Sequence, residues 1–391
     1  MTKNKVLMPF MAFIAFSFLI SNANAITYTT NQEVCGSLSD TTVQVNPGVI
    51  LRVCDYNGTA NTGYWNVSAT TINIYGTINA TGSGYRGGAS VSTFVTPNNG
   101  EGLGGGMITY CIDNGNGNDG STGSGGGFGG IGGRGYDASS SGSGSCATFQ
   151  DSGFTTPGPI YGNATDLSVY FGSGGSGGSS SDTYNSECGG DGGGAVVLNG
   201  TTININGTID VTGLIGCYSG FSGISGGGGS GGTILIYGNT IYSDFAVLNA
   251  SGGSGQEFLL PGPQSIGESG GGGGGRIKIF YSELLSNNSA QISVLKGFQN
   301  IFFVPTSGPN GENGTFAIMT FEAPPEPPSI PTGFAGLTTT INFVAVIIAL
   351  GIVGIIYTNI RKNKFDSNEM IEVIVLSIFT GISLSLLLSV I

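Results

Sequence analysis

Two stretches of the chain alternate apolar and polar residues with a period of two, which is the pattern of a β-strand that buries one face. They are TTINIYGTINATG at 70–82 and TTININGTIDVTG at 201–213, and ten of their thirteen positions are identical. The positions expected to face the core are Ile72, Ile74, Ile78 and Ala80 in the first stretch, and Ile203, Ile205, Ile209 and Val211 in the second. Asn73, Tyr75, Thr77 and Asn79 are expected to face solvent. The chain therefore contains an internal repeat of half-buried strands.

Further alternating segments follow glycine-rich runs: AVVLNG begins at 195, TILIYG at 233 and RIKIFY at 276. TILIYGNTI, which starts at Thr233, is a looser third copy of the repeat. Starts that lie 38 and 43 residues apart are in the range of solenoid repeats, whose short strands are stabilised by stacking on the next coil. We therefore predict an all-β ectodomain: a glycine-rich parallel β-helix or β-solenoid over 69–322, with an N-terminal β cap over 26–68.

Glycine makes up 74 of the 391 residues. We expect the glycines to turn the corners of the solenoid with positive φ and to let neighbouring backbones approach closely, because no other residue does both without a steric clash. On this hypothesis the run at 270–275 belongs to the ordered core. The longer run GSTGSGGGFGGIGGRG at 120–135 is either part of that core or a flexible surface loop.

The first 25 residues have the features of a secretory signal peptide. Lys3 and Lys5 precede a short apolar run, and Ala23 and Ala25 supply the small residues of a cleavage site. The alternative is a retained N-terminal anchor helix. The apolar run of about 15 residues is short for a membrane span, which usually needs about 20.

Two long apolar segments near the other end, 337–360 and 370–391, are each long enough to cross the membrane as a helix. Arg361, Lys362 and Lys364 follow the first segment directly, so the positive-inside rule predicts that the loop 361–369 is cytoplasmic. The proline-rich stretch at 323–336 is expected to form a semi-rigid stalk. The sequence thus predicts a C-terminal transmembrane hairpin in the cell membrane, with the solenoid on the extracellular face. The lipid bilayer is its first expected partner.

All six cysteines lie in the part expected to be exported, where disulfides are favoured. They are Cys35, Cys54, Cys111, Cys146, Cys188 and Cys217. Six thiols allow 15 connectivities, and the preferred hypothesis pairs sequence neighbours: 35 with 54, 111 with 146, and 188 with 217. A metal site is the weaker interpretation, because the chain has no C-x-x-C motif and no histidine.

Residues 26–336 contain 20 Asp and Glu against six basic side chains, a net charge of −14. A surface this acidic repels phosphate backbones, so we exclude nucleic acid as a partner. Surface glycans or envelope proteins are the remaining candidate partners. No cofactor is expected.

Nine N-x-S/T tripeptides are candidate glycosylation sites, as expected of an exported chain. The asparagines are Asn57, Asn66, Asn79, Asn163, Asn199, Asn206, Asn249, Asn287 and Asn313. Asn79 and Asn206 are placed on the outward phase of their strands. The alternative is that a chain rich in Asn, Ser and Thr contains these tripeptides by chance.

The strand pairs of the TINIYGTINATG type, and glycine runs before strands such as GGGGGGRIKI and GGGSGGTILI, resemble glycine-rich β-solenoid surface proteins and adhesins of bacteria and archaea. The resemblance covers about residues 40–320. It implies a membrane-anchored surface protein with a role in adhesion or in the structure of the cell envelope. The alternatives are a viral spike or virion membrane protein, and a membrane-tethered β-helix enzyme that acts on polysaccharides.

Catalytic signals are weak, and we predict that the chain is not an enzyme. Polysaccharide lyases and hydrolases need paired carboxylates, or a basic residue beside a metal-binding acidic cluster. The acids in the glycine-rich segments are spread out, with few basic residues nearby; examples are Asp113, Asp119, Asp137, Asp151, Asp182 and Asp191. CIDNGNGNDG at 111–120 is rich in oxygen ligands like a calcium loop, but glycine occupies ligand positions after Asp113, so a plain turn is the preferred interpretation.

Overall fold

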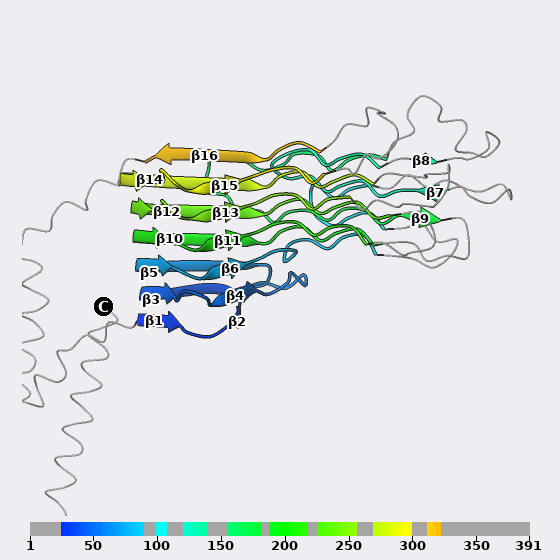
Figure 1. The fold of residues 1–391 in the computed structure, drawn as a ribbon. Helices are drawn as coiled ribbons and strands as arrows, with labels where there is room; N and C mark the ends of the chain where they lie inside the picture. Colours follow the sequence, from blue (N-terminus) through cyan, green and yellow to red (C-terminus); the bar gives the residue numbers. More distant parts are fainter. Residues whose placement is uncertain are drawn as a thin grey trace, which may run out of the picture. The chain divides into compact units, whose positions relative to one another are not determined.

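The computed structural model describes nine ranges of the chain: 25–89, 98–107, 120–135, 137–138, 155–180, 188–217, 225–255, 269–298 and 311–321. These ranges form an all-β body (Figure 1). They include no helix that is long and apolar enough to cross a membrane. The expected stalk, the two expected spans and residues 1–24 of the expected signal peptide lie outside these ranges.

Two parallel sheets and one small antiparallel sheet make up the body. The first sheet has the order β1 (Ala25–Tyr28), β3 (Gly36–Val45), β5 (Tyr64–Ile74), β10 (Ala195–Ile205), β12 (Thr233–Tyr242), β14 (Arg276–Ser286) and β16 (Thr315–Thr320). The second has the order β15 (Gln291–Ser293), β13 (Val247–Asn249), β11 (Thr208–Asp210), β6 (Thr77–Asn79), β4 (Ile50–Val53) and β2 (Gln32–Val34). The third contains β8 (Asp137–Ala138), β7 (Gly120–Ser121) and β9 (Ser179–Ser180). The parallel order supports a β-solenoid-like arrangement.

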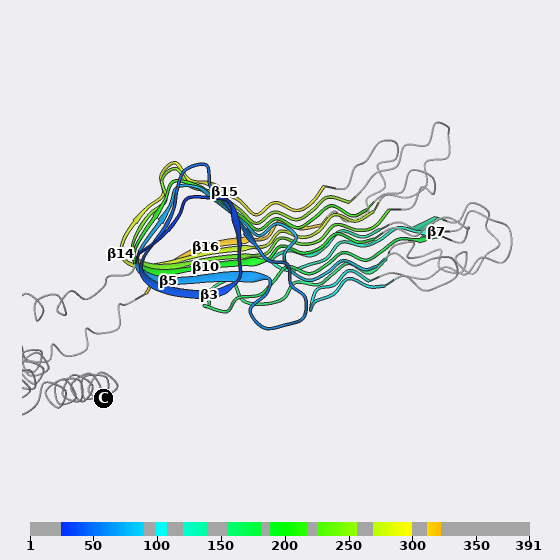
Figure 2. The same ribbon diagram turned by 90° about the horizontal axis from the view of Figure 1, so that it is seen from below.

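Each coil follows three sides of a triangle, which is visible when the body is seen along the stack (Figure 2). In the coil that begins at Ala195, residues 195–200 form the first side. Thr201 then interrupts the pairing, residues 202–205 form the second side, and β11 forms the third. The long strands of the first sheet therefore bend at a corner near their middle.

The glycine-rich runs lead into equivalent positions of successive coils, as the sequence predicts. Ala195 pairs with Thr233, and Thr233 pairs with Arg276. The expected alignment of the third repeat copy at Thr233, however, is wrong. That residue begins a first side, whereas the counterpart of the TINI segment begins at Thr240, which pairs with Thr202 and through it with Thr71. Both sides alternate in the same way, so periodicity alone cannot separate them.

The core of the solenoid consists of inward-facing aliphatic side chains stacked in rows from coil to coil. Ile72, Ile203 and Ile241 form one such row, and Ile78, Ile209 and Leu248 form another; all six are completely buried. The inward positions predicted from the alternation at 70–82 and 201–213 are confirmed. Residues 26–68 contribute to β1 through β5 of the same two sheets.

Beside the solenoid, glycine-rich segments run next to one another as a bundle without regular strand pairing (Figure 2). The segment 225–232 lies in its centre. The amides of Gly226, Gly229 and Gly232 donate to the carbonyls of one neighbouring segment, at residues 217, 214 and 211. The amides of Gly227 and Ser230 donate to a second segment, at 176 and 173, and those of Gly228 and Gly231 to a third, at 270 and 273. Successive amides thus point to three different neighbours in turn. This threefold period, with no hydrogen bonds inside the segment, is that of a polyproline II helix.

The carbonyls of the same segment accept hydrogen bonds from three further neighbours, through the amides of Gly190, Gly126 and Gly253. Each helix of this kind satisfies its backbone groups only when other helices surround it, because it makes no bonds of its own. The bundle is therefore ordered by contacts between segments that lie far apart in the sequence.

The run at 270–275 belongs to the buried part of this bundle, which confirms the expectation that it is ordered. A Cβ atom on Gly273 would lie 2.1 Å from the carbonyl oxygen of Gly130. Of the two roles expected for glycine, this run shows the close approach of backbones, whereas positive φ occurs at single glycines such as Gly48 and Gly82. The run at 120–135 is also part of the bundle and largely buried, so the flexible-loop alternative is wrong.

The described body has two distinct ends (Figure 1). The chain enters at β1 and leaves after β16 at one end, which we call the base. The glycine-rich segments run away from the base, and β7, β8 and β9 lie at the opposite end, which we call the tip. The bundle thus carries the tip away from the points where the chain enters and leaves.

Candidate functional site

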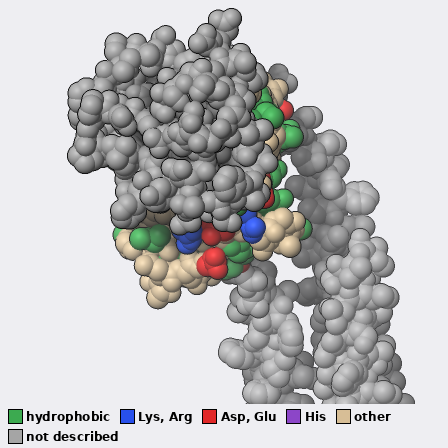
Figure 3. Space-filling view, turned by 90° about the vertical axis from the view of Figure 1, so that its right-hand side faces the viewer, with side chains coloured by type: hydrophobic (Ala, Val, Ile, Leu, Met, Phe, Trp, Pro, Cys, Tyr) green, Lys and Arg blue, Asp and Glu red, His purple; other side chains and the backbone are tan. Residues whose placement is uncertain are grey.

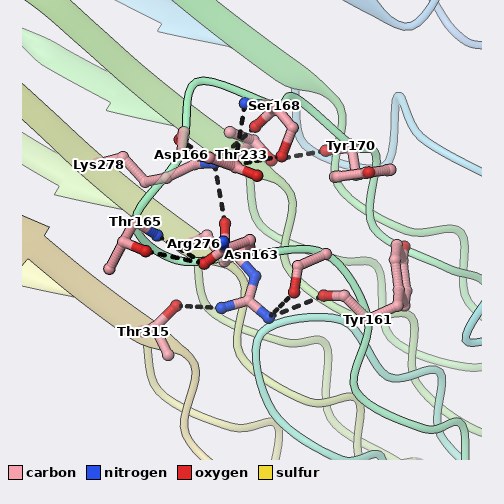
Figure 4. Close-up of polar contacts among 11 residues, drawn as sticks. Tyr161, Asn163, Thr165, Asp166, Ser168, Tyr170, Thr233, Arg276, Lys278 and Thr315 are labelled. Carbon is pink, nitrogen blue, oxygen red and sulfur yellow. Dashed lines mark hydrogen bonds and ion pairs between the residues drawn. The ribbon is translucent and has the colours of Figure 1, made fainter.

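Two buried cations on the outer face of the first sheet hold the segment 155–171 against the solenoid (Figure 4). Lys278 on β14 is 1 % exposed, and its ammonium group donates to backbone oxygens of Asn163 at 3.1 Å, Asp166 at 2.9 Å and Ser168 at 2.5 Å. It also forms an ion pair with the Asp166 carboxylate at 3.3 Å. Carbonyl oxygens therefore take up most of the hydrogen-bonding capacity of this amine.

Arg276 fastens the preceding part of the same segment. Its guanidinium donates to the carbonyl oxygens of Tyr161 at 2.7 Å and Gly162 at 3.2 Å, and to the Thr315 hydroxyl at 2.7 Å. The guanidinium carbon also lies 5.3 Å from the centre of the Phe128 ring. Arg276 thereby joins the segment, the glycine-rich bundle and the last strand of the sheet.

Burial lowers the pKa of Lys278, and the neighbouring Asp166 counteracts this shift. The pKa of Asp166 is itself lowered, first by the Ser168 hydroxyl that donates to it and then by Lys278. A lysine that serves as a general base or nucleophile needs access to a substrate. Lys278 lies beneath a covering segment, and Asp166 is its one charged partner among the described residues. The arrangement is that of a clamp.

The sequence does not reveal this clamp. The alternation in RIKIF correctly indicates a strand, but it predicts that Lys278 faces solvent. Lys278 does point outward, and the segment 155–171, more than a hundred residues earlier in the chain, then covers it. Two basic residues at alternate strand positions, in a region with very few basic residues, are the one signal that could have drawn attention to them.

An aromatic cluster lies next to the clamp. The Tyr161 ring packs 4.8 Å from that of Phe128 and 5.9 Å from that of Tyr170, measured between centroids. The Tyr161 hydroxyl donates to the carbonyl of Phe171 and accepts from the Ser173 hydroxyl at 2.9 Å. Burial strongly raises the pKa of Tyr161. These contacts tie the covering segment to the bundle.

Two of the three expected disulfides are confirmed, Cys35–Cys54 and Cys188–Cys217. Cys188 and Cys217 belong to neighbouring segments of the bundle, and the Cys217 amide donates to the Cys188 carbonyl. The disulfide therefore joins two segments that are also connected through their backbones. Cys111 and Cys146 lie outside the described residues.

Four of the nine candidate glycosylation tripeptides form local turns. The side-chain oxygens of Asn57, Asn79, Asn163 and Asn249 accept hydrogen bonds from the backbone amide two residues later. Asp210, the register partner of both Asn79 and Asn249, makes the same contact to Thr212. Because an aspartate does this equally well, the turn explains these asparagines without a glycan.

The remaining candidate asparagines occupy varied positions. Asn199 and Asn206 are exposed, but Asn206 lies in the turn between β10 and β11 and not on a strand. Asn66 and Asn287 are partly buried, and Asn313 is exposed and accepts from the Lys296 amide. Asn199, on the outer face of β10, is thus the exposed candidate that lies within a strand.

The acidic residues do not converge in the part of the chain that the structure describes, and no group of three or more potential metal ligands occurs there. Asp191 is partly buried. Burial raises its pKa, while the Gly87 amide donates to its side chain at 2.7 Å. The contact links two glycine-rich segments. The calcium-like stretch at 111–120 lies outside the described residues except for Gly120.

Seen from the tip side, the described atoms that are visible include hydrophobic, basic and acidic side chains close together, with no large patch of one kind (Figure 3). The chain matches no protein-family model, and no curated protein or solved structure is significantly similar to it. The function must therefore be inferred from the sequence and the geometry alone.

Proposed function

We propose that the chain is an exported, membrane-anchored surface protein with a role in adhesion or in the structure of the cell envelope. In this proposal a signal peptide directs export, the two apolar segments at 337–360 and 370–391 anchor the chain, and the solenoid lies on the extracellular face. The glycine-rich bundle acts as a rigid extension that displays the tip.

The separation of base and tip carries the proposal. The chain enters and leaves the described body at the base, so a C-terminal anchor connects to the end opposite the tip. The bundle between them is held by hydrogen bonds in several directions, and the clamp of Arg276 and Lys278 fixes a covering segment on the solenoid. Such a body resists bending, which suits a protein that presents a surface at a distance from its anchor.

Surface labelling of intact cells tests the proposal. An antibody raised against the solenoid should label intact cells that produce the full-length chain, and the labelled protein should remain with the membrane fraction after an alkaline carbonate wash. Cells that lack the gene should attach less firmly to their natural surfaces or show a weakened envelope. Protein found only in the cytoplasm, or released freely into the medium, would contradict the proposal.

A further inference from the structure

The bend in the long strands creates a polar groove on the outside of the solenoid. Ala69 pairs with Gly200 and Thr71 with Thr202, while Thr70 and Thr201 are left out of the register. These unpaired residues form one wall of a groove with a volume of about 370 Å³, which crosses β3, β5, β10 and β12. The volume is in the range of small-ligand sites. The groove is open to solvent, and neither Arg276 nor Lys278 lines it.

Hydroxyl and amide groups line the groove. Ser68, Thr70, Asn199, Thr201 and Asn239 face it from three successive coils, and none of the described residues is a hydrogen-bond partner of these five side chains. Their donors and acceptors are thus available to a ligand. Asp40 is the one charged residue in the lining, and its carboxylate already accepts from the Thr41 amide at 2.6 Å. A groove without basic residues does not suit an anionic ligand.

An aromatic side chain completes one end of the groove. Tyr237 lines it, and the Tyr237 ring stacks on Phe321 with centroids 4.4 Å apart and also packs against Phe280 at 6.4 Å. The ring is held by its neighbours before any ligand arrives, so little conformational entropy is lost when it makes a contact. Aromatic rings with a polar group favour ligands that have both apolar and hydroxylated surfaces.

The polar positions of the groove repeat from coil to coil. Neighbouring strands in a sheet lie about 4.8 Å apart, so four coils present equivalent polar positions over about 14 Å. A linear chain of hydroxylated rings matches this spacing and this chemistry. We propose that the groove binds a neutral glycan, with hydroxyls of the sugar bonded to the free side chains and one ring placed against Tyr237.

The position of the groove indicates which glycan it meets. The bend lies at the base: Ala25, where the described chain begins, pairs with Thr42 just beyond the bend, and Phe321, where it ends, stacks on Tyr237. If the chain is anchored as proposed above, the groove lies at the end of the body that is nearer to the cell in whose membrane the protein is anchored. This part of the inference rests on the proposed function and favours a neutral polysaccharide of the cell's own envelope.

Isothermal titration calorimetry on the full-length protein tests the proposal. The protein is held in a detergent without a sugar headgroup, which removes competition from the detergent. The probes are a panel of linear neutral oligosaccharides and, separately, neutral polysaccharide isolated from the envelope of the producing cells. Thr201→Trp fills the groove and Tyr237→Ala removes its aromatic end. Thr208→Trp, on the outer face of β11, is the matched control, and thermal unfolding checks that each variant is folded.

We expect binding of at least one neutral glycan, at least tenfold weaker in Thr201→Trp and Tyr237→Ala and unchanged in Thr208→Trp. Tighter binding of the envelope preparation identifies the cell's own glycan as the source, whereas tighter binding of other oligosaccharides indicates a target surface. Absence of binding to every probe at millimolar concentration, or equal binding by folded groove variants, overturns the proposal. Asn199→Gln removes the candidate glycosylation tripeptide at Asn199 but keeps a side-chain amide in the groove. Unchanged binding in this variant therefore shows that the measured binding does not depend on a glycan attached to Asn199.

These results are independent of the surface-labelling test. If intact cells are labelled but no glycan binds, the groove proposal fails and the proposed function stands. If the glycan binds but the protein is not on the surface, the proposed function fails and the groove remains a glycan site.

Discussion

The α-carbon of Gly273 lies so close to the backbone of Gly130 that a side-chain carbon on Gly273 would stand 2.1 Å from the Gly130 carbonyl oxygen. The two residues belong to different segments of the bundle, and the Gly273 amide donates to Gly126 of the same partner segment. Backbone packs directly on backbone here. The requirement for glycine is therefore steric, and it does not depend on an unusual φ.

Replacing Gly273 by Asn or Ala should destabilise the protein by about 1–3 kcal/mol or more, because the added carbon meets a backbone oxygen that is itself held in the bundle. Gly48 is the matched control. It has φ of 78°, a side-chain carbon added there would meet nothing within 4 Å, and asparagine tolerates this conformation. Gly48→Asn should change the free energy of unfolding by less than about 0.5 kcal/mol. Equal unfolding midpoints for the two asparagine variants in a urea titration would refute the steric account.

Lys278→Met should cost about 2–4 kcal/mol, because three carbonyl oxygens of the segment 155–171 lose their donor and the Asp166 carboxylate loses its ion pair. Lys296→Met, which removes a partly exposed lysine that follows β15 of the second sheet, is the control and should have little effect. Limited proteolysis gives a second measurement: cleavage within 155–171 should become faster in Lys278→Met alone. If the two methionine variants unfold alike, the clamp does not stabilise the fold.

The buried Tyr161 should make stability depend on alkaline pH. Burial raises its pKa above the ordinary value of 10.0, so in this range the unfolded chain loses the proton first. The folded state then binds more protons than the unfolded state, and stability falls as the pH rises above about 10. Tyr161→Phe should be less stable at neutral pH but should lose less stability between pH 9 and 11, as measured by urea unfolding. Tyr242→Phe, which changes an exposed tyrosine, is the control. A Tyr161→Phe variant with the wild-type pH slope would show that this proton is not linked to folding.

Asn249→Asp should leave stability nearly unchanged, because Asp210 forms the same turn one coil away. Asn249→Leu should cost about 1 kcal/mol, since the amide of Ser251 loses its side-chain acceptor. Thermal unfolding compares the two variants. Equal losses in both would mean that the asparagine side chain has a role beyond this turn.

The transmembrane hairpin predicted from the sequence can be tested by labelling single introduced cysteines with a membrane-impermeant reagent on intact cells. Ser329→Cys, in the expected stalk, should react. Asp366→Cys, in the expected cytoplasmic loop, should react only after the cells are permeabilised. The reverse pattern would mean that the orientation is inverted, and the extracellular location of the solenoid would have to be abandoned.

The repeated strands could be predicted because side-chain alternation records which face is buried. The equivalence of Ala195, Thr233 and Arg276 follows from the glycine run that precedes each of them, because alternation alone does not separate the first side of a coil from the second. The path of the glycine-rich segments could not be predicted, since glycine has no side chain that marks one direction as buried. The burial of Lys278 was also hidden, because it depends on a covering segment distant in sequence. The hypothesis that cysteines pair with their sequence neighbours correctly predicted the Cys188–Cys217 disulfide, because these two residues lie on adjacent segments of the bundle.

The threefold order of hydrogen bonds around segment 225–232 constrains how the bundle can change in length. Adding one residue to a segment turns every later amide by about a third of a revolution, so each donor points at the wrong neighbour. Adding three residues restores every direction and moves the segment along by about 9 Å, the rise of one complete turn. Insertions and deletions in multiples of three can therefore lengthen or shorten the segments of the bundle while the hydrogen bonds between them keep the same directions. Insertions of other lengths break this pattern of hydrogen bonds.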